Sequence, residues 1–145
     1  MKIKVKLTDG APMPKYAKPG DAGMDLTSRE DVELKPFETR IVGTGVSVEI
    51  PEGYVGLLFP RSGLASKRGI TLAHAVGVID SGYRGEIKAP LFNTTTGFNY
   101  VDRDERICQL VIMPFNQCEL VEVDELEESE RGDTGFGSSG CYYDA

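Results

Sequence analysis

The chain is poor in the residue types from which many catalytic and metal centres are built. It has one histidine, His74, and three cysteines, Cys108, Cys118 and Cys141, which cannot all pair with one another. No cysteine lies at metal-ligand spacing from another or from His74, so a zinc cage is excluded. A Ser-His-Asp set and a Walker loop are also missing. The odd, scattered cysteines are typical of a reduced, cytoplasmic protein.

Long hydrophobic runs and a basic excess are absent too. No apolar stretch approaches the length of a membrane span. The opening MKIKVKLTDG alternates charged and apolar residues, as an edge strand does and a signal peptide does not. The net charge is −7, and residues 119–130 (ELVEVDELEESE) hold seven acidic side chains with no Lys or Arg. We therefore expect no membrane partner and no nucleic-acid partner, since bulk nucleic-acid binding needs a basic surface.

The sequence does contain a repeated period of two. A length of 145 residues fits one domain with a sizeable core, and turn signals separate short alternating segments. One segment, 62–69 (SGLASKRG), predicts a short helix with Ser62 as its N-cap and Gly69 just past its end. The pattern predicts an all-β jelly roll, sandwich or barrel, with strands in KIKVKL, DVELK, GVSVEI, YVGLLF, EIKAPLF, FNYV, RICQLVIMPF and CELVEV.

Four glycine-punctuated or polar clusters combine ionisable groups with loops or strand ends, where chemistry on a β scaffold usually lies. Each has an ordinary structural explanation: a capped turn, a helix N-cap, a β-turn, and a strand with a polar entrance. The third explanation is incomplete, because a β-turn does not account for Tyr83 and Arg84 beside Asp80. The clusters are DAGMDLTS (21–28), PRSGLASKRG (60–69), GVIDSGYRGE (77–86) and DERICQLVI (104–112).

The clusters gain meaning when they are taken together. Arg61, Arg106 and Arg131, with hydroxyls and glycine-exposed amides, suit a polyphosphate. Asp25 and Asp80 suit a magnesium ion and a general base, because Mg²⁺ keeps most of its waters and is held mainly by substrate phosphates plus one or two carboxylates.

Two aromatic residues in glycine-rich segments, Tyr83 and Phe136, suit a nucleoside. Phe136 lies in RGDTGFGSSG (131–140), a composition that by itself indicates a flexible tail. Taken with the other clusters, it is better interpreted as a lid that closes over a site.

At this point the ordered series resembles a known family. DAGMDLTS, PRSGLASKRG, GVIDSGYRGE, RICQL and RGDTGFGSSG are similar to the five motifs of the trimeric deoxyuridine triphosphate nucleotidohydrolases (dUTPases), in order and over nearly the whole chain. The resemblance implies a jelly-roll homotrimer whose three active sites are each shared between subunits. It also implies a Mg²⁺-dependent conversion of dUTP and water to dUMP and pyrophosphate.

The resemblance assigns roles to residues of the phosphate and catalytic segments. Asp80 is expected to deprotonate the attacking water, and Asp25 to hold the magnesium assembly through water. Arg106 is expected to be an ion-pair partner within the fourth motif. The expected phosphate contacts are Arg61, Ser62, Gly63 and Gln109.

Other positions are expected to recognise the nucleoside. Tyr83 resembles the aromatic residue that packs under the deoxyribose and excludes a ribose 2′-hydroxyl, and Gly77 and Val78 are expected to contact the substrate. His74 stands where many members carry an asparagine that contacts uracil, so either a contact through its imidazole or main chain, or a packed or surface histidine, is open. Cys108 replaces a usual alanine, and we expect it only to fill space.

The C-terminal motif is expected to complete the site. Residues 1–130 are expected to form the jelly-roll core and 131–145 a flexible arm that closes over the site of a neighbouring subunit. Within the arm, the substrate contacts are expected to be Arg131, Phe136, Gly137 and Ser138.

Two other functions remain open on the sequence alone. A dCTP deaminase of the same fold, alone or bifunctional, needs an additional acid near the base, and Glu86 is the only carboxylate near the third motif. A non-catalytic trimeric binding module is the second alternative. The presence of Asp80 and of the complete arm argues against it.

Overall fold

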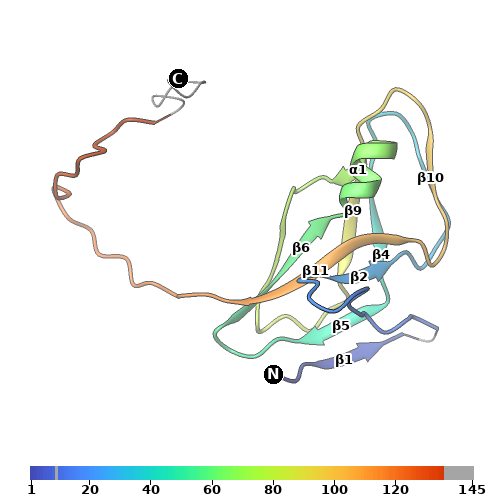
Figure 1. Cartoon of the computed structure of the whole chain (residues 1–145), viewed down its shortest axis with the longest axis horizontal. Helices are drawn as coiled ribbons and strands as arrows, with labels where there is room; N and C mark the ends of the chain where they lie inside the picture. The colour runs from blue at the N-terminus through green and yellow to red at the C-terminus, as the bar shows by residue number, and fades with distance from the viewer. Residues whose placement is uncertain (9, 136–145) are drawn as a thin grey trace.

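The computed structural model describes residues 1–8 and 10–135, and in that part the chain is built almost entirely of strands (Figure 1). All the paired strands run antiparallel, and α1 (Ser62–Arg68) is the single helix of the described residues. The strands are β1 Lys4–Leu7, β2 Met24–Thr27, β3 Val32–Leu34, β4 Thr39–Gly43, β5 Val46–Glu49, β6 Tyr54–Pro60, β7 Ile70–Leu72, β8 Gly77–Ile79, β9 Lys88–Asn93, β10 Asn99–Val101 and β11 Arg106–Pro114.

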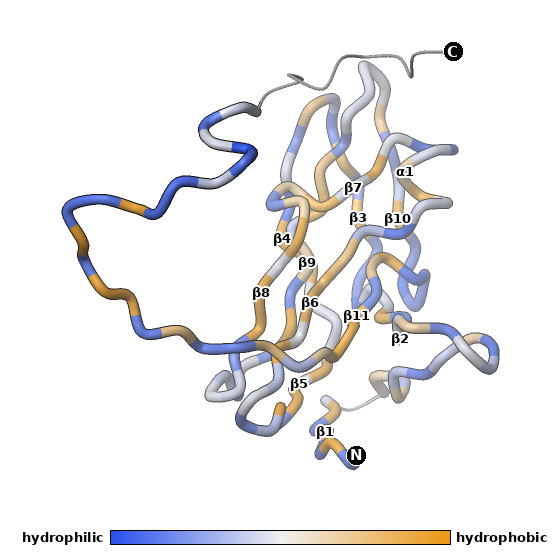
Figure 2. The backbone as a smooth tube through the Cα atoms, turned by 60° about the vertical axis from the view of Figure 1, so that its left-hand side comes forward, coloured by the Kyte–Doolittle hydropathy of each residue, from blue (hydrophilic) through white to orange (hydrophobic). Residues whose placement is uncertain are grey.

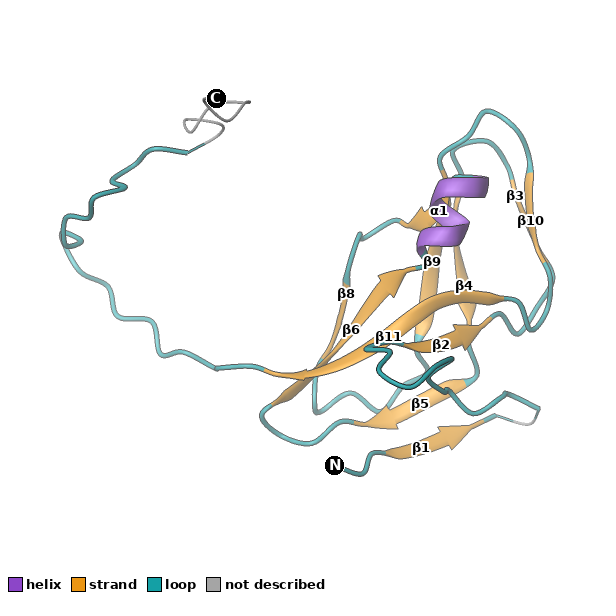
Figure 3. Ribbon diagram, in the orientation of Figure 1, coloured by secondary structure: helices purple, strands orange, loops and turns teal. Residues whose placement is uncertain are grey.

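The strands form two main sheets and two smaller ones. The larger sheets have the orders β2-β11-β6-β8 and β4-β9-β7, and the pairs β1-β5 and β10-β3 extend the arrangement at the edges. Figure 3 shows the strands wrapped around a common interior, with α1 at one end. The all-β prediction with one short helix is therefore confirmed.

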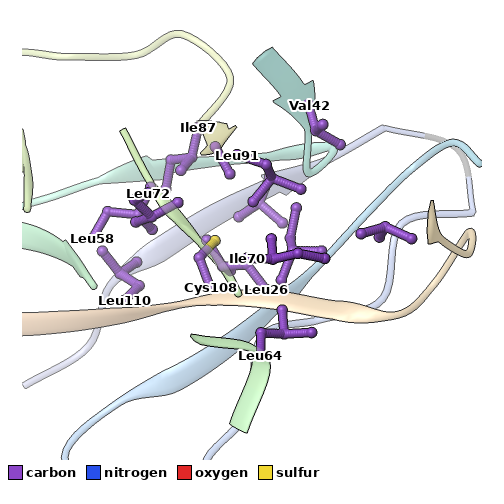
Figure 4. Close-up of a cluster of buried hydrophobic side chains, with 14 of the residues drawn as sticks. Leu26, Val42, Leu58, Leu64, Ile70, Leu72, Ile87, Leu91, Cys108 and Leu110 are labelled. Carbon is purple, nitrogen blue, oxygen red and sulfur yellow. The ribbon is translucent and has the colours of Figure 1, made fainter. Parts of the chain in front are cut away.

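The core lies between the two main sheets, and its composition follows from the alternation along each strand. Leu58 and Leu110 reach it from one sheet, and Leu72 and Leu91 reach it from the other (Figure 4). Burial alternates in β9 as well, where every second side chain is buried, as expected of a strand with one face on the core. The period of two in the sequence thus arises because each of these strands has one face on the core and one face turned away from it.

Helix α1 ends as predicted but begins differently. Gly69 adopts the left-handed conformation, with φ of 64°, and its N–H bonds to Ala65 O, which is the geometry that favours glycine at a helix end. The N-cap, however, is Arg61 in an extended conformation, without a side-chain capping bond, so the prediction of Ser62 as N-cap is wrong. Ser62 is instead the first helical residue, because Arg61 O accepts the first N–H bonds of the helix, from Leu64 and Ala65.

One predicted strand does not form. Residues 118–123 (CELVEV) have the alternating pattern, yet they are irregular and exposed, and Leu120 is 94% exposed. A strand requires a neighbour that satisfies its N–H and C=O groups, and no strand of the described residues pairs with this segment. Figures 1 and 2 show the chain leaving the body after β11 and running away from it. The last backbone hydrogen bond that joins the chain to the body runs from Phe115 N to Gly53 O, 3.1 Å.

Candidate functional site

Asp25 lies at the centre of one hollow on the surface, a pocket of about 380 Å³. Its two carboxylate oxygens accept hydrogen bonds from different arginines. Arg61 Nε reaches Oδ1 and Arg106 Nη1 reaches Oδ2, each at 2.9 Å. The pairs join β2, the residue before α1, and the start of β11. Arg106 is therefore the ion-pair partner expected from the sequence.

Gln109 completes this pocket from the middle of β11. It lies opposite Asp25 in the β2-β11 ladder, and its Nε2 donates to Pro60 O at 3.1 Å. Gly23 allows this arrangement, because a Cβ at residue 23 would lie 3.2 Å from Gln109 Cβ and still closer to the side-chain amide. The glycine of the first motif therefore makes room for the glutamine of the fourth.

A β-bulge in β11 brings Arg106 and Gln109 to the same pocket. Residues three apart in a regular strand point to opposite faces, but the register against β2 shifts between Arg106 and Cys108. Ile107 and Cys108 are consecutive and both are buried in the core. The extra residue turns Arg106 and Gln109 to the face that carries Asp25, which is a common use of bulges beside functional sites.

Cys108 has no access to the pocket. Burial first, and the charge of Asp25 second, raise the pKa of its thiol to about 12. A thiol that stays protonated and buried is a weak nucleophile and a poor metal ligand. The expectation that Cys108 only fills space is supported by its burial.

The helix start supplies the other wall of this pocket. Ser62 and Gly63 line it with Arg61, and the first N–H groups of a helix have no intrahelical acceptor. Because no side chain caps them, these amides stay available to an anion in the same hollow that holds the arginines. The sequence-predicted Arg61, Ser62, Gly63, Gln109 and Asp25 are thus together.

The loop that connects β8 in one main sheet to β9 in the other forms a second hollow, of about 310 Å³. We call this loop the hairpin for its tight turn at Asp80–Tyr83, although its two flanking strands do not pair with each other. Asp80 follows β8 directly, as the sequence predicted, and its N-terminal neighbours pair with β6. Its carboxylate is exposed and has no hydrogen-bond or ion-pair partner among the described residues. The sequence-predicted residues that line this pocket are His74, Gly77, Val78, Asp80 and Tyr83.

Two glycines leave room for the rings of His74 and Tyr83 to pack against the backbone. A Cβ on Gly77 would lie 2.9 Å from His74 Nε2, and a Cβ on Gly85 would lie 2.6 Å from Tyr83 Cζ. The imidazole therefore rests on Gly77, whereas the phenol rests on Gly85 with its hydroxyl donating to Glu86 O at 2.9 Å. Neither ring could hold this position over a larger residue.

The far end of the hairpin is fastened to the turn between β4 and β5. Glu86 Oε1 accepts from Gly45 N at 2.8 Å, and Ile87 N donates to Val46 O at 2.8 Å. A Cβ on Gly43 would lie 2.6 Å from Glu86 Oε1. Glu86 is thus occupied with holding the backbone in place.

The two hollows share no lining residue. The arginine pocket and the Asp80 pocket are therefore separate within one chain. Arg131 lies in the exposed C-terminal segment, which Figure 1 shows leading away from the body of strands. Phe136, Gly137 and Ser138 lie outside the described residues.

Comparison with known proteins agrees with this geometry. The dUTPase family model matches residues 9–140. The chain belongs to the dUTPase family. It is 49% identical over 136 residues to a deoxyuridine 5′-triphosphate nucleotidohydrolase of Thermobifida fusca, covering 93% of this chain and 76% of that protein. It is 44% identical over 142 residues to the enzyme of that name from Finegoldia magna, covering 97% and 99%.

Solved structures give the same result. A Staphylococcus bacteriophage 80alpha dUTPase variant with dUpNHpp superposes with a TM-score of 0.90 at 38% identity, covering 96% of this chain and 98% of that one. The resemblance of the five motifs to dUTPases is thereby confirmed.

Sequence reasoning missed several residues that line these pockets. Phe59 and Asp21 stand in the arginine pocket, and Lys88 stands at the hairpin pocket. Phe59 belongs to an apolar strand and Lys88 to the entry of another, so neither carries a signal that separates it from ordinary strand residues. Asp21 lies within the first motif, where its backbone-capping bond to Lys18 N, 2.8 Å, fits a turn equally well.

Two features are absent from the described residues. Within the described residues, no three His, Cys, Asp or Glu side chains gather as a ready metal cage. Over the same part of the chain, no helix has both the length and the apolar character needed to cross a membrane.

Proposed function

We propose that this dUTPase-family chain hydrolyses dUTP to dUMP and pyrophosphate. The observation that carries the proposal is the division of chemistry between two pockets, one with arginines and free amides, the other with an unpaired carboxylate beside an aromatic ring. The first suits a triphosphate and the second suits a nucleoside and an attacking water. The names of the curated relatives and the dUpNHpp complex of the phage enzyme support this substrate.

In the arginine pocket, Arg61, the amides of Ser62 and Gly63, and Gln109 bind the triphosphate. Charge-assisted bonds from guanidinium groups to phosphate oxygens are among the strongest available. Because Asp25 holds the Arg61 and Arg106 guanidinium groups at 2.9 Å, both are oriented before the substrate arrives. Orientation in advance lowers the cost of binding.

A magnesium ion fits this pocket as a partner of the substrate. The pocket offers one carboxylate, Asp25, whose oxygens each accept one arginine N–H and keep further acceptor sites. That donor set fits an ion held by phosphate oxygens and waters, with Asp25 contacting a water. Bound Mg²⁺ would neutralise charge on the triphosphate.

At the hairpin, Asp80 takes a proton from the water that attacks the α-phosphorus. The new bond joins the water oxygen to that phosphorus, the bond to the bridging oxygen breaks, and pyrophosphate departs. Tyr83 packs under the deoxyribose, so a 2′-hydroxyl would collide with its ring. The base is faced by Gly77, Val78 and His74. The close packing of the His74 imidazole against Gly77 supports a contact between this ring and the base.

We further propose that the enzyme is a homotrimer in which the arginine pocket of one subunit meets the hairpin pocket of another. The separation of the two pockets in one chain supports this assembly. So does the exposure of Leu120 and Leu126, 94% and 88%, which a neighbour would cover. The core would comprise residues 1–130, although the last strand ends at Pro114. The arm, 131–145, would then close a neighbour's site with Arg131, Phe136, Gly137 and Ser138.

The direct test is incubation of the purified protein with dUTP and Mg²⁺ and detection of pyrophosphate. Absence of pyrophosphate release would overturn the proposal in favour of a binding module. Release of ammonia from dCTP would instead indicate a deaminase, but Glu86, the acid that such chemistry requires, already accepts a bond from Gly45 N. The cytoplasm, where nucleotides are processed and Cys108 and Cys118 stay free thiols, remains the predicted compartment.

The shared site has its own test. Subunits carrying Arg61→Gln and subunits carrying Asp80→Asn are expected to be nearly inactive as pure assemblies. Mixed assemblies should recover activity, because some sites combine an intact arginine pocket with an intact hairpin from another subunit. If each site lay within one chain, mixing would restore nothing.

A further inference from the structure

The turn that follows Asp80 is held only at its two ends by the sheet. Before it, β8 pairs with β6, and after it, Glu86 and Ile87 bond to the β4-β5 turn. Residues 81–85 between these anchors belong to no strand. Their conformation therefore depends on bonds made within the hairpin itself.

Arg84 supplies two of those bonds. Its Nη1 donates to Ser81 O at 2.6 Å and to Tyr83 O at 2.8 Å. One guanidinium nitrogen thus closes the loop across the turn, in which Tyr83 N also donates to Asp80 O at 3.0 Å. These bonds fix the backbone that carries both the carboxylate of Asp80 and the ring of Tyr83.

We propose that Arg84 is a positioning residue, which holds the Asp80–Tyr83 turn in the shape required for hydrolysis and for sugar selection. The inference rests on the proposed function. Arg84 does not line the pocket that Asp80 and Tyr83 share. It faces a neighbouring hollow of about 520 Å³ that also exposes Ser81, Gly82 and Glu49. Its effect on the reaction therefore passes through the turn.

Glu49 lies on the same side of the turn as Arg84. Both residues line the hollow behind the turn and the adjoining hollow beside β1. The pKa of the Glu49 carboxyl is lowered first by its hydrogen bond and ion pair with Lys4, and in smaller part by the charge of Arg84. A carboxylate behind the turn favours the orientation in which Arg84 bonds to the two carbonyls.

The physical consequence is a loss of preorganisation when the guanidinium is removed. Ser81 O and Tyr83 O are then solvated by water, which does not hold them at a fixed separation. The turn gains conformations in which Asp80 and Tyr83 are displaced. Displacement of a catalytic group by about 1 Å can cost 10²-fold in rate.

The test compares Arg84→Met, which removes the donors, and Arg84→Lys, which keeps the charge, with the wild-type oligomer. Arg40→Met is a matched control, because Arg40 is also exposed and also donates to a backbone carbonyl, Glu33 O. We expect Arg84→Met to lower kcat for dUTP roughly 10- to 100-fold and to reduce the ratio of kcat/KM for dUTP over UTP. Arg84→Lys should lose most of the same activity, and Arg40→Met none.

A readout independent of turnover is hydrogen exchange. The Tyr83 amide should exchange about tenfold faster in Arg84→Met than in the wild type or Arg40→Met, because its acceptor is no longer fixed. Melting temperatures show whether each variant is folded. If Arg84→Met does not fold, the activity and the Tyr83 amide exchange of Arg84→Lys are compared with those of the wild type.

Three outcomes would overturn the inference. Full activity in Arg84→Lys, or a rise in KM alone in Arg84→Met, would show that Arg84 acts as a charge for the substrate. Unchanged Tyr83 exchange would show that the turn does not depend on it. A wild-type protein that fails to hydrolyse dUTP would refute the proposed function. If the wild type is active and the Arg84 variants have the same activity, only the role of Arg84 is refuted.

Discussion

Asp80 carries the proposed chemistry at the scale of a single residue. It stands immediately after a strand, exposed and unpaired among the described residues, so its carboxylate is available to a water. Asp25 is the opposite case, because both of its oxygens are bound by arginines. The two carboxylates are therefore suited to different tasks: Asp80 can accept a proton, and Asp25 can orient charged groups.

Asp80→Asn is expected to lower kcat by roughly 10²–10⁴-fold, the usual contribution of a positioned general base. Binding of a non-hydrolysable dUTP analogue should stay near the wild-type value, since the amide keeps the shape of the carboxylate. Steady-state kinetics and calorimetry measure the two effects. Glu30→Gln, an exposed carboxylate elsewhere, is the control, and near-normal turnover in Asp80→Asn would refute the base assignment.

Cys108 should make stability depend on alkaline pH. The unfolded thiol ionises near 9.0, whereas the folded thiol holds its proton to about 12. Between these values the folded state binds more protons, so its contribution to stability is complete below pH 9 and is lost as the pH rises toward 12. Cys108→Ala should cost about 1 kcal/mol at neutral pH.

The measurement is denaturant unfolding of both proteins at one subunit concentration from pH 8 upward. The wild type should lose stability faster than Cys108→Ala, by up to about 1.4 kcal/mol per pH unit within the window. Equal slopes would show that the thiol titrates normally in the folded protein.

At the scale of elements, the site depends on a bulge within one strand and on the loop that follows another. The bulge in β11 aims Arg106 and Gln109 at one pocket. The hairpin after β8 seats Tyr83 on Gly85. Regular strands could have supplied the same residues but not the same directions.

Gly85→Ala tests the packing of the Tyr83 ring against Gly85. The added Cβ would fall 2.6 Å from Tyr83 Cζ, so the rigid ring must move and the wall against a 2′-hydroxyl is displaced. We expect the kcat/KM ratio of dUTP over UTP to fall about tenfold, in line with the 1–3 kcal/mol of a modest steric discrimination. Gly82→Ala, in the same hairpin but with open space around its Cβ, should leave the ratio unchanged. An unaltered ratio in Gly85→Ala would argue against Tyr83 as the sugar wall.

At the scale of the whole molecule, one chain holds the parts of a site without assembling them. The two pockets have no described residue in common, and the C-terminal segment runs away from the body of strands (Figure 2). The same segment carries Leu120, Val121, Val123 and Leu126, all exposed. Apolar side chains in such a row need a covering surface, which a second and third copy would provide.

Removal of residues 131–145 is expected to leave a folded assembly with at least about 100-fold lower kcat/KM, the effect of losing charge-stabilising donors from a site. Sedimentation should still give three copies of the shortened chain. Removal of 141–145 alone keeps RGDTGFGSSG and should have little effect. Full activity without 131–145 would eliminate the arm from the mechanism.

Much of the fold could be predicted because local physics dictates it. A period of two marks strands wherever one face is buried, and Gly69 marks the helix end because only glycine adopts its left-handed conformation without cost. The same reasoning was wrong for 118–123, where the alternation is present but the partner strand is not. It was also wrong for Ser62, because a serine near a helix start does not fix which carbonyl accepts the first bond.

The sequence by itself determined most of the strands, the short helix and the five motifs that mark the family, since these depend on side-chain type and short-range spacing. The strands β4 and β7 were not among the predicted segments. Only the tertiary structure decided how the motifs are grouped. Asp25, Arg61, Arg106 and Gln109 come together because β2, β6 and β11 are neighbours in one sheet and β11 has a bulge. Asp80 and Tyr83 remain apart from them because β8 runs antiparallel to β6 and ends beside Gly56, whereas Arg61 follows the opposite end of β6. Distances between motifs are set by strand order, which the spacing of residues along the chain does not encode.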